Sequence, residues 1–290
     1  MVNRPPLLLI AALLAPALMG LCVFTLYPIV LAVGESFWSL SKGERIFVGF
    51  GNYLTLLADK GFWNSLWVTV WFNVLINPIQ IALSTGLALL YTQRFRGIGF
   101  YRFVFLIPIG VSLPTAVMIW RIMLSPDGLM NGLLDLSGVP PQPWLTSQGL
   151  ALYSIIAIAT WKGISYWMIF IIGGLQLIPT EIYDSARVDG VKPWQRLVFI
   201  TLPLLRPTLL FVLVADVSIN FLLFSPIYML TQGGPANSTN VLMYEAYKSG
   251  FVFGDMGRAM AIIVMVVLIL MIVVGLQFRL LAGSRKARAR

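Results

Sequence analysis

Two ionisable side chains lie deep inside long apolar stretches of this sequence, where a charge is costly unless it is paired or functional. At 1.5 Å per helical residue, Lys162 lies about 25 Å from Pro179, and Asp216 lies about 20 Å from Pro203. The two prolines bound one short polar segment, so we expect both side chains at similar depth. This placement predicts either a structural ion pair between two helices or direct contact with a transported solute. A third interpretation is that the side chains snorkel toward a cavity or an interface.

Aromatic and amide side chains accompany these charges at helical spacing. Tyr166 and Trp167 lie about one turn after Lys162. Asn220 lies one turn after Asp216. Amide groups bind sugar hydroxyls, and aromatic faces pack against the C–H side of a sugar ring. A further polar stripe, at spacings of three and four residues, is expected either to pack between helices or to line a solute path. This stripe consists of Thr69, Asn73, Asn77, Gln80 and Ser84.

The residue inventory argues against catalysis in this chain. The sequence has no histidine, one cysteine (Cys22) in an apolar run, and 11 acidic residues scattered along its length. It therefore lacks the commonest general base, a cysteine-based metal site and the clustered acids of a membrane-embedded glycosyltransferase. A single intramembrane acid also falls short of the series that an ion channel or proton-driven carrier needs. No G-x-x-x-x-G-K-[ST] phosphate loop occurs, which excludes ATP hydrolysis by that mechanism.

The composition predicts a polytopic membrane protein. Of 290 residues, 59% are apolar and 11% are charged, and the mean hydropathy is +0.87. Soluble domains are about half apolar and a quarter charged, which excludes an ordinary globular chain. A membrane-spanning helix needs about 20 mostly apolar residues. Six stretches meet this requirement and predict an all-α fold forming a single domain over residues 1–290. They are residues 7–33, 66–91, 100–123, 150–178, 204–229 and 259–281.

The basic residues indicate an orientation in the membrane. Most of the 20 lysines and arginines fall on one side if both termini are cytoplasmic, as the positive-inside rule favours. This assignment predicts a multi-pass protein of a cell membrane. The net charge of +9 is then a topology signal and not a nucleic-acid patch. The residues expected on the cytoplasmic side are Arg4, Arg94, Arg96, Arg102, Arg187, Lys192, Arg196, Arg206, Arg279, Arg285, Lys286, Arg288 and Arg290.

The segment between the fourth and fifth stretches, residues 179–203, has a different character. Thr180 and Glu181 are typical of a helix start, Gly190 of a helix end, and Pro193 of the first turn of a second helix. Charged residues alternate with apolar ones at helical spacing. The segment therefore predicts an amphipathic helix–turn–helix on the cytoplasmic side, and a helix lying in the lipid interface is the simplest interpretation.

Its spacing resembles the EAA loop of permease subunits of bacterial ABC importers, in which E-A-A, three residues, Gly, nine residues and I-x-L-P follow one another. Asp184, Ser185 and Ala186 stand at the E-A-A positions, and Gly190 follows after three residues. After nine more residues, Ile200, Leu202 and Pro203 match I-x-L-P without any insertion. Aspartate replaces the usual glutamate and serine replaces alanine, but an acid is kept at the first position. The resemblance implies docking of an ATPase, with Glu181 and Asp189 beside the motif.

Other residues resemble the carbohydrate-uptake branch, of the maltose and glycerol-3-phosphate type, along the whole chain. These are Tyr27-Pro28, Ser36-Phe37-Trp38, Asn52-Tyr53 and Thr231-Gln232-Gly233-Gly234-Pro235. The resemblance implies a second homologous permease, a cytoplasmic ATPase dimer and an extracytoplasmic solute-binding protein as partners. It also implies that ATP and magnesium are bound by the ATPase, with no cofactor and no metal in this chain.

The same resemblance implies which residues hold the solute midway through the membrane. Counted from the loop, the positions are Gly163, Tyr166, Trp167, Asn220 and Leu223, together with Ser112 in the third stretch; Lys162 and Asp216 accompany them as the ionisable residues. We expect a neutral or weakly charged sugar or sugar derivative. Glycerol 3-phosphate or a glycerophosphodiester is the runner-up, because Lys162 is the only cation expected at this depth. A glycosyltransferase-type enzyme ranks below both.

Overall fold

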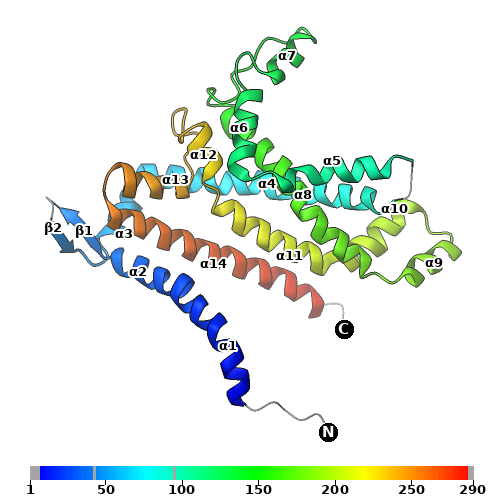
Figure 1. The fold of residues 1–290 in the computed structure, drawn as a ribbon, viewed down its shortest axis with the longest axis horizontal. Coiled ribbons are helices and arrows are strands. Elements are labelled where there is room, and N and C mark those ends of the chain that lie inside the picture. Colours follow the sequence, from blue (N-terminus) through cyan, green and yellow to red (C-terminus); the bar gives the residue numbers. More distant parts are fainter. Residues whose placement is uncertain (1–6, 42–43, 94–95, 287–290) are drawn as a thin grey trace. The chain divides into compact units, whose positions relative to one another are not determined.

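A computed structural model describes residues 7–41, 44–93 and 96–286 of the chain (Figure 1). Four of the basic residues predicted on the cytoplasmic side lie outside the described residues: Arg4, Arg94, Arg288 and Arg290. The backbone groups into two compact units. The first comprises Met1–Phe62 and Glu245–Leu268, and the second comprises Trp63–Tyr244 and Ile269–Arg290.

The first unit begins with one long apolar helix that is interrupted once. A five-residue π-turn separates its two halves just before Pro28, whose missing N–H breaks the regular hydrogen-bond ladder. The elements are α1 (Leu7–Leu21), η1 (Cys22–Leu26), α2 (Tyr27–Glu35), β1 (Trp38–Ser41), β2 (Glu44–Phe47) and α3 (Gly51–Ala58). The strands form an antiparallel hairpin in which Trp38 faces Phe47. The sequence predicted an all-α fold and gave no indication of this hairpin.

Residues of two motifs that resemble the carbohydrate-uptake branch connect this hairpin to α3. The Asn52 amide donates to the carbonyls of Ser36 and Trp38 at 2.8 and 2.9 Å. The Ser36 hydroxyl lies 2.6 Å from the Tyr53 hydroxyl. These residues therefore have a structural reason for their presence, because they satisfy polar groups at the end of α2.

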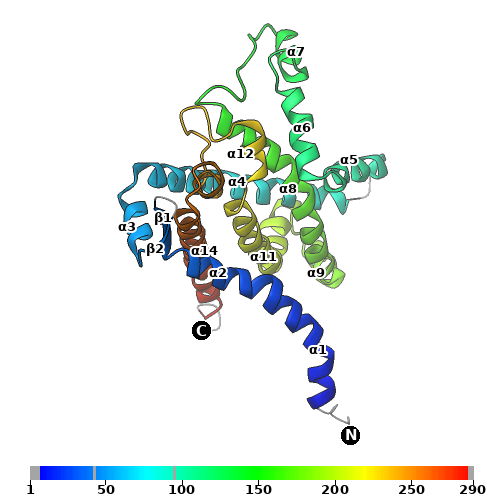
Figure 2. The ribbon, with the colours of Figure 1, turned by 60° about the vertical axis from the view of Figure 1, so that its left-hand side comes forward.

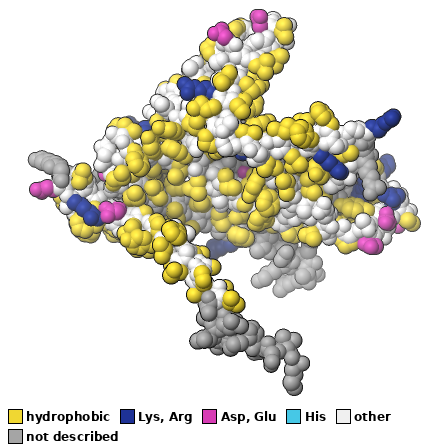
Figure 3. All heavy atoms as spheres, in the orientation of Figure 1, with side chains coloured by type: hydrophobic (Ala, Val, Ile, Leu, Met, Phe, Trp, Pro, Cys, Tyr) yellow, Lys and Arg dark blue, Asp and Glu magenta, His cyan; other side chains and the backbone are white. Residues whose placement is uncertain are grey.

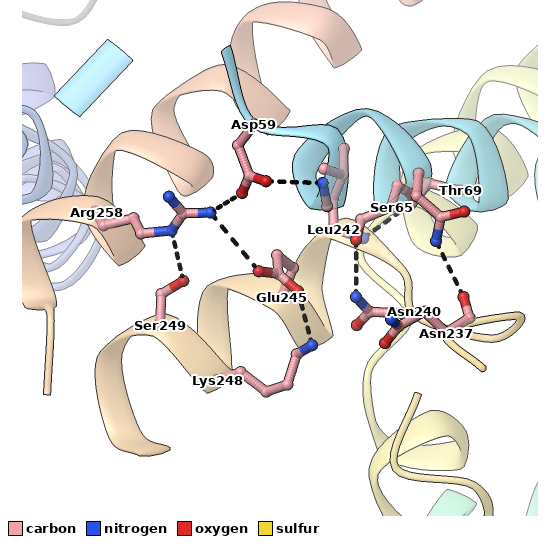
Figure 4. A network of polar contacts seen from close by, with 12 residues as sticks. Asp59, Ser65, Thr69, Asn237, Asn240, Leu242, Glu245, Lys248, Ser249 and Arg258 are labelled. Carbon is pink, nitrogen blue, oxygen red and sulfur yellow. Dashed lines mark hydrogen bonds and ion pairs between the residues drawn. The ribbon is translucent and has the colours of Figure 1, made fainter. Parts of the chain in front are cut away.

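A charged network closes the first unit around Arg258, near the start of α14 (Met256–Lys286) (Figure 4). Its guanidinium donates to the Asp59 carboxylate and to the Ser249 hydroxyl, and it lies 3.8 Å from Glu245. Glu245 also pairs with Lys248 at 2.8 Å. Burial opposes ionisation of Asp59, but hydrogen bonds from Arg258 and from the Gly61 amide outweigh it and lower the pKa of that carboxyl below 3.8.

Replacement of Asp59 by asparagine is therefore expected to destabilise the first unit in a pH-dependent way. The stability that comes from a lowered carboxyl pKa is present above the ordinary value of 3.8 and is lost as pH falls through the folded-state pKa. The variant should thus melt below the wild type by a constant margin around neutral pH. The margin should shrink only in acid below 3.8. Thermal unfolding in detergent at several pH values measures this, with the exposed Asp127→Asn as control; a margin that grows in acid would contradict the assignment.

The second unit contains the remaining long helices. They are α4 (Lys60–Tyr91, entering from the first unit), α5 (Ile98–Gly110), α6 (Leu113–Met123), α7 (Leu129–Asp135), α8 (Ala151–Gln176), α9 (Thr180–Val188), α10 (Pro193–Arg196), η2 (Leu197–Thr201), α11 (Leu202–Phe221) and α12 (Ser225–Leu230). The units are linked again through α13 (Leu242–Tyr247) and η3 (Lys248–Val252). Helix α8 is the centre of the second unit, because α5, α6, α11 and α12 all pack against it (Figures 1 and 2).

The described helices confirm a multi-span all-α protein, with one change to the predicted stretches. Five helical segments are long and apolar enough to cross a membrane, and a bent pair can form a sixth. The predicted stretch 100–123 is this pair: α5 and α6 meet at 107°. Ser112 has extended backbone there and caps α6, whose first turn contains Pro114. The stretch 204–229 likewise breaks after Phe221, and α12 resumes at Ser225.

Hydrophobic side chains cover the long helices of the second unit, and charged ones gather near α7 and around α9 and α10 (Figure 3). The core between α4, α8 and α11 is formed by Ala88, Met168, Ile171, Leu205 and Val212. The polar stripe of α4 is buried against the rest of the unit. At one end of the stripe, Thr69 accepts from the Leu242 amide at 2.9 Å (Figure 4). This burial fits the first of the two alternatives for the stripe, which is packing between helices.

Candidate functional site

A cavity of about 270 Å³ lies in the second unit between α4, the bend of α5 and α6, α8 and α11. Seven of its lining residues are those predicted from the sequence to contact solute: Lys162, Gly163, Tyr166, Trp167, Asp216, Asn220 and Leu223. The lining is mostly apolar with a few polar groups, which is the usual character of a small-molecule site. The volume is close to the lower end of the range for small-molecule sites, which is about 300–1,000 Å³.

Asp216 is the most deeply buried polar group of this cavity, with 1% of its surface exposed. One carboxylate oxygen, Oδ1, accepts from the Trp167 indole at 2.7 Å and from the Asn220 amide at 2.9 Å. Asn220 also donates to Asn77 Oδ1 at 2.7 Å. Asn77 in turn donates to Asn73 at 3.2 Å. A chain of amides from α4 thus orients the carboxylate on α11.

The other carboxylate oxygen of Asp216, Oδ2, is buried and has no hydrogen-bond partner among the described residues. A buried acceptor without a donor costs about 1–3 kcal/mol. Since the residue lines the cavity, a donor on a bound molecule would remove that cost. Asp216 thus brings a buried acceptor, without a donor in the described part of the chain, to the wall of the cavity.

Lys162 has a different set of partners from the predicted one. Its ammonium donates to the carbonyl of Pro108 at 2.5 Å, to that of Ile109 at 3.3 Å and to that of Val111. An ammonium has three N–H donors, so these bonds use all of them. The carbonyls are those that the break between α5 and α6 leaves without helical partners. Lys162 therefore caps the end of α5.

The structure differs from two of the sequence-based expectations about this cavity, the ion pair being one of three interpretations of the two charges. Lys162 and Asp216 do not form an ion pair, because each is held by neutral groups on a different wall of the cavity. Ser112 does not line the cavity; it is exposed and its hydroxyl accepts from the Thr115 amide as the cap of α6. Both side chains line the same cavity, but similar positions along two helices do not determine which way each side chain points.

The other lining residues were not among those that the resemblance implied to hold the solute, although a solute path was one alternative for the stripe that contains Gln80. Gln80 belongs to the polar stripe of α4, and its amide donates to the Ala159 carbonyl at 2.9 Å. A Cβ atom at Gly163 would lie 2.3 Å from the Gln80 amide nitrogen, so glycine is what lets α4 approach α8 here. The apolar walls, Ile109, Leu113, Ala159 and Ile219, give no signal in the sequence that separates them from other membrane residues.

Replacement of Lys162 by methionine is expected to destabilise the second unit by about 1–3 kcal/mol, because the carbonyls at the break lose their donor. Detergent-solubilised protein should show a lower thermal midpoint, whereas the exposed Lys60→Met control should not. The double variant Lys162→Met, Asp216→Asn should show additive losses, since the two side chains do not touch. If the double variant recovered stability, the result would support an ion pair between the two residues and contradict this assignment.

The predicted helix–turn–helix between residues 179 and 203 is present. Helix α9 ends where Gly190 takes a left-handed backbone with φ +69°, and the Val191 amide closes the turn on the Ala186 carbonyl at 3.0 Å. Pro193 begins α10, and the Gln195 side chain accepts from the Lys192 amide at 3.0 Å. The sequence interpretation of Gly190 as a helix end is therefore confirmed.

The motif residues occupy distinct parts of this segment. Ala186 is buried, while Asp184 is exposed and pairs with Arg187 at 3.2 Å within the helix. Glu181, Ser185 and Asp189 are also exposed. Ile200, Leu202 and Pro203 form the junction of η2 with α11. Val188, at the end of α9, is by contrast 87% exposed in the described part of the chain.

The segment is continuous with the helices that carry the cavity. Helix α8 leads into α9, and η2 leads into α11, so both flanking helices present residues to the cavity. The Tyr183 hydroxyl of α9 lies 3.3 Å from the Thr201 hydroxyl, just before α11. The apolar core described above packs α8 against α11 between the segment and the cavity. Through α8 and α11, α9 is thus connected to two walls of the cavity.

Known proteins match this chain over nearly its whole length. The sn-glycerol-3-phosphate transport system permease protein UgpA of Agrobacterium fabrum is 34% identical, with 92% of each chain covered. The trehalose/maltose permease protein MalF of Thermococcus litoralis is 33% identical, with 86% of this chain and 85% of that one covered. The lactose permease protein LacF of Rhizobium radiobacter is 36% identical, with 82% of each covered.

The fold also has a counterpart among solved structures. A chain of a bacterial ABC transporter involved in the import of the acidic polysaccharide alginate superimposes with a TM-score of 0.81, at 22% identity and 95% coverage of both chains. A family profile described as "Binding-protein-dependent transport system inner membrane component" matches residues 6–286. This chain therefore belongs to the family of inner-membrane components of binding-protein-dependent transport systems.

Proposed function

We propose that this chain is the transmembrane subunit of an ATP-driven importer and forms, with a second homologous permease, the path of a sugar or sugar derivative. The observation that carries the proposal is that one pair of helices, α8 and α11, bears both the EAA-type segment and the walls of the cavity. A solute-binding protein delivers the solute on the outer side. A cytoplasmic ATPase dimer, which binds ATP and magnesium, docks on α9 and α10.

The orientation of the chain follows from the same proposal. The segment 179–203 faces the cytoplasm with both termini, as the distribution of basic residues favours. The exposed Val188 and Ile182 then belong to the surface that the ATPase covers. Exposed apolar side chains beside charged ones are typical of a docking surface.

The chemistry of the cavity supports a solute that donates hydrogen bonds. The free oxygen of Asp216 accepts a donor, and Tyr166, which is 45% exposed, presents an aromatic ring at the lining. Sugar hydroxyls and ring C–H groups match these two features. Lys162 has its donors engaged by backbone carbonyls, so it is a poor partner for phosphate. The names of the UgpA relatives keep glycerol 3-phosphate as the second candidate.

Reconstitution tests the proposal directly. The chain is purified with the second permease and the ATPase encoded by neighbouring reading frames and is placed in liposomes with the solute-binding protein. We expect ATP-dependent uptake of a sugar from a panel of lactose, maltose, trehalose and glycerol 3-phosphate. Uptake without the ATPase would contradict the proposed energy source. Uptake of glycerol 3-phosphate alone would contradict the solute class.

A further inference from the structure

A second cavity, of about 510 Å³, lies in the second unit beside the EAA-type segment and away from the solute cavity. Its walls are the end of α4, the end of α8, one face of α9 and the α10–η2 segment. The proposed function places the ATPase on α9 and α10 but gives no role to the space that they enclose with α4 and α8. It is large enough for the phosphate-bearing part of a lipid or metabolite.

The charges around this cavity are unbalanced in favour of arginine. Arg187 and Arg196 both line it, and Asp184 is the acid that lines it with them. Asp184 pairs with Arg187 through one nitrogen at 3.2 Å. The guanidinium of Arg196 lies over the Tyr183 ring, with its central carbon 5.7 Å from the ring centroid. It has no acidic partner among the described residues. Stacking fixes the plane of a guanidinium and leaves its N–H groups available in that plane.

Uncharged donors complete the lining. They are Gln176, Thr180 and Thr201. A planar guanidinium with neighbouring hydroxyl and amide donors is a typical arrangement for binding the oxygens of a phosphate group. Carboxylates bind to the same groups, but a phosphate has more acceptor oxygens for a site with this many donors.

We propose that this cavity binds a phosphate group and that its occupancy restrains α9 against the ends of α4 and α8. The phosphate comes either from an anionic phospholipid headgroup or from a free phosphate compound. The exposed aromatic pair Trp194 and Phe199, with ring centroids 6.1 Å apart on the same segment as Arg196, is typical of the headgroup level of a membrane. The effect on coupling rests on the proposed function, whereas the binding itself does not.

The experiment measures binding to the complex of this chain with its second permease and ATPase, free of nucleotide. The lipid probe is phosphatidylglycerol in nanodiscs, compared with phosphatidylcholine by native mass spectrometry. The free probe is inorganic phosphate, followed by 31P line broadening. Arg196→Gln should weaken binding of the effective probe about tenfold, because a charge-assisted hydrogen bond is lost. Arg196→Lys, which keeps the charge but not the fork, should retain an intermediate affinity.

Arg279→Gln is the matched control, since Arg279 carries the same charge on the same expected side of the membrane but does not line the cavity. Loss in Arg196→Gln alone supports the proposal, and the probe that responds identifies the source of the phosphate. Equal loss in Arg196→Gln and Arg279→Gln, or binding unchanged in both, would overturn it. The two permeases are also measured without the ATPase. If they bind the probe and the full complex does not, the proposal is overturned, because the ATPase then occupies the cavity. ATP-dependent uptake is measured separately, so its absence in wild type refutes the proposed function without affecting the binding comparison.

Discussion

Replacement of Gly190 by valine is expected to abolish solute-stimulated ATP hydrolysis and uptake while leaving membrane insertion intact. Gly190 has φ +69°, a conformation that a β-branched residue adopts only at a cost of about 1–3 kcal/mol. No atom lies within 4 Å of the Cβ that a substitution would add, so the cost arises from the backbone and not from a clash. The turn that presents α9 and α10 would then rearrange, and the ATPase would lose its contact.

Asparagine at the same position is the matched control. Asn tolerates the left-handed conformation, so Gly190→Asn should retain most of the stimulated activity. ADP release is measured with and without solute-loaded binding protein, and the yield of assembled complex is measured by co-purification. Normal stimulation in Gly190→Val would show that the segment 179–203 does not couple hydrolysis to transport.

Asp216→Asn is expected to reduce uptake at limiting solute by about tenfold or more, with assembly preserved. The asparagine oxygen can still accept from Trp167 and Asn220, so the network around it keeps its geometry. The free Oδ2, however, is replaced by an NH2 group. The cavity thereby offers a donor where the solute would present a donor, and the solute hydroxyl loses its partner.

The control for Asp216→Asn is the same substitution at the exposed Asp135, which should not alter transport. The solute concentration at half-maximal uptake and the yield of assembled complex are measured for both variants. Reduced assembly with normal transport per complex would identify Asp216 as a structural residue. If neither quantity changed, Asp216 would have no role in recognition.

The sequence alone identified the long apolar helices and the helix–turn–helix of segment 179–203, because both depend on local information. An apolar stretch of about 20 residues is stable in lipid as a helix, because a helix satisfies the hydrogen bonds of its own backbone. The Gly190 turn was predictable for a similar reason, since it depends on the conformational freedom of one residue. The motif spacing from Asp184 to Pro203 then pointed to the family that the comparisons established.

Tertiary structure decided what the side chains inside the membrane do. Lys162 and Asp216 have matching depths, but the bend between α5 and α6 places free carbonyls beside the ammonium and so draws it away from the carboxylate. Whether that stretch breaks depends on packing against α8, because proline is tolerated in straight and in bent membrane helices. Trp167, one partner of Asp216, lies on α8, and Asn77, which holds the other partner Asn220, lies on α4. No local pattern specifies the relative rotation of these helices and α11. Depth is a property of position along one helix, whereas a binding site is a property of several helices packed together.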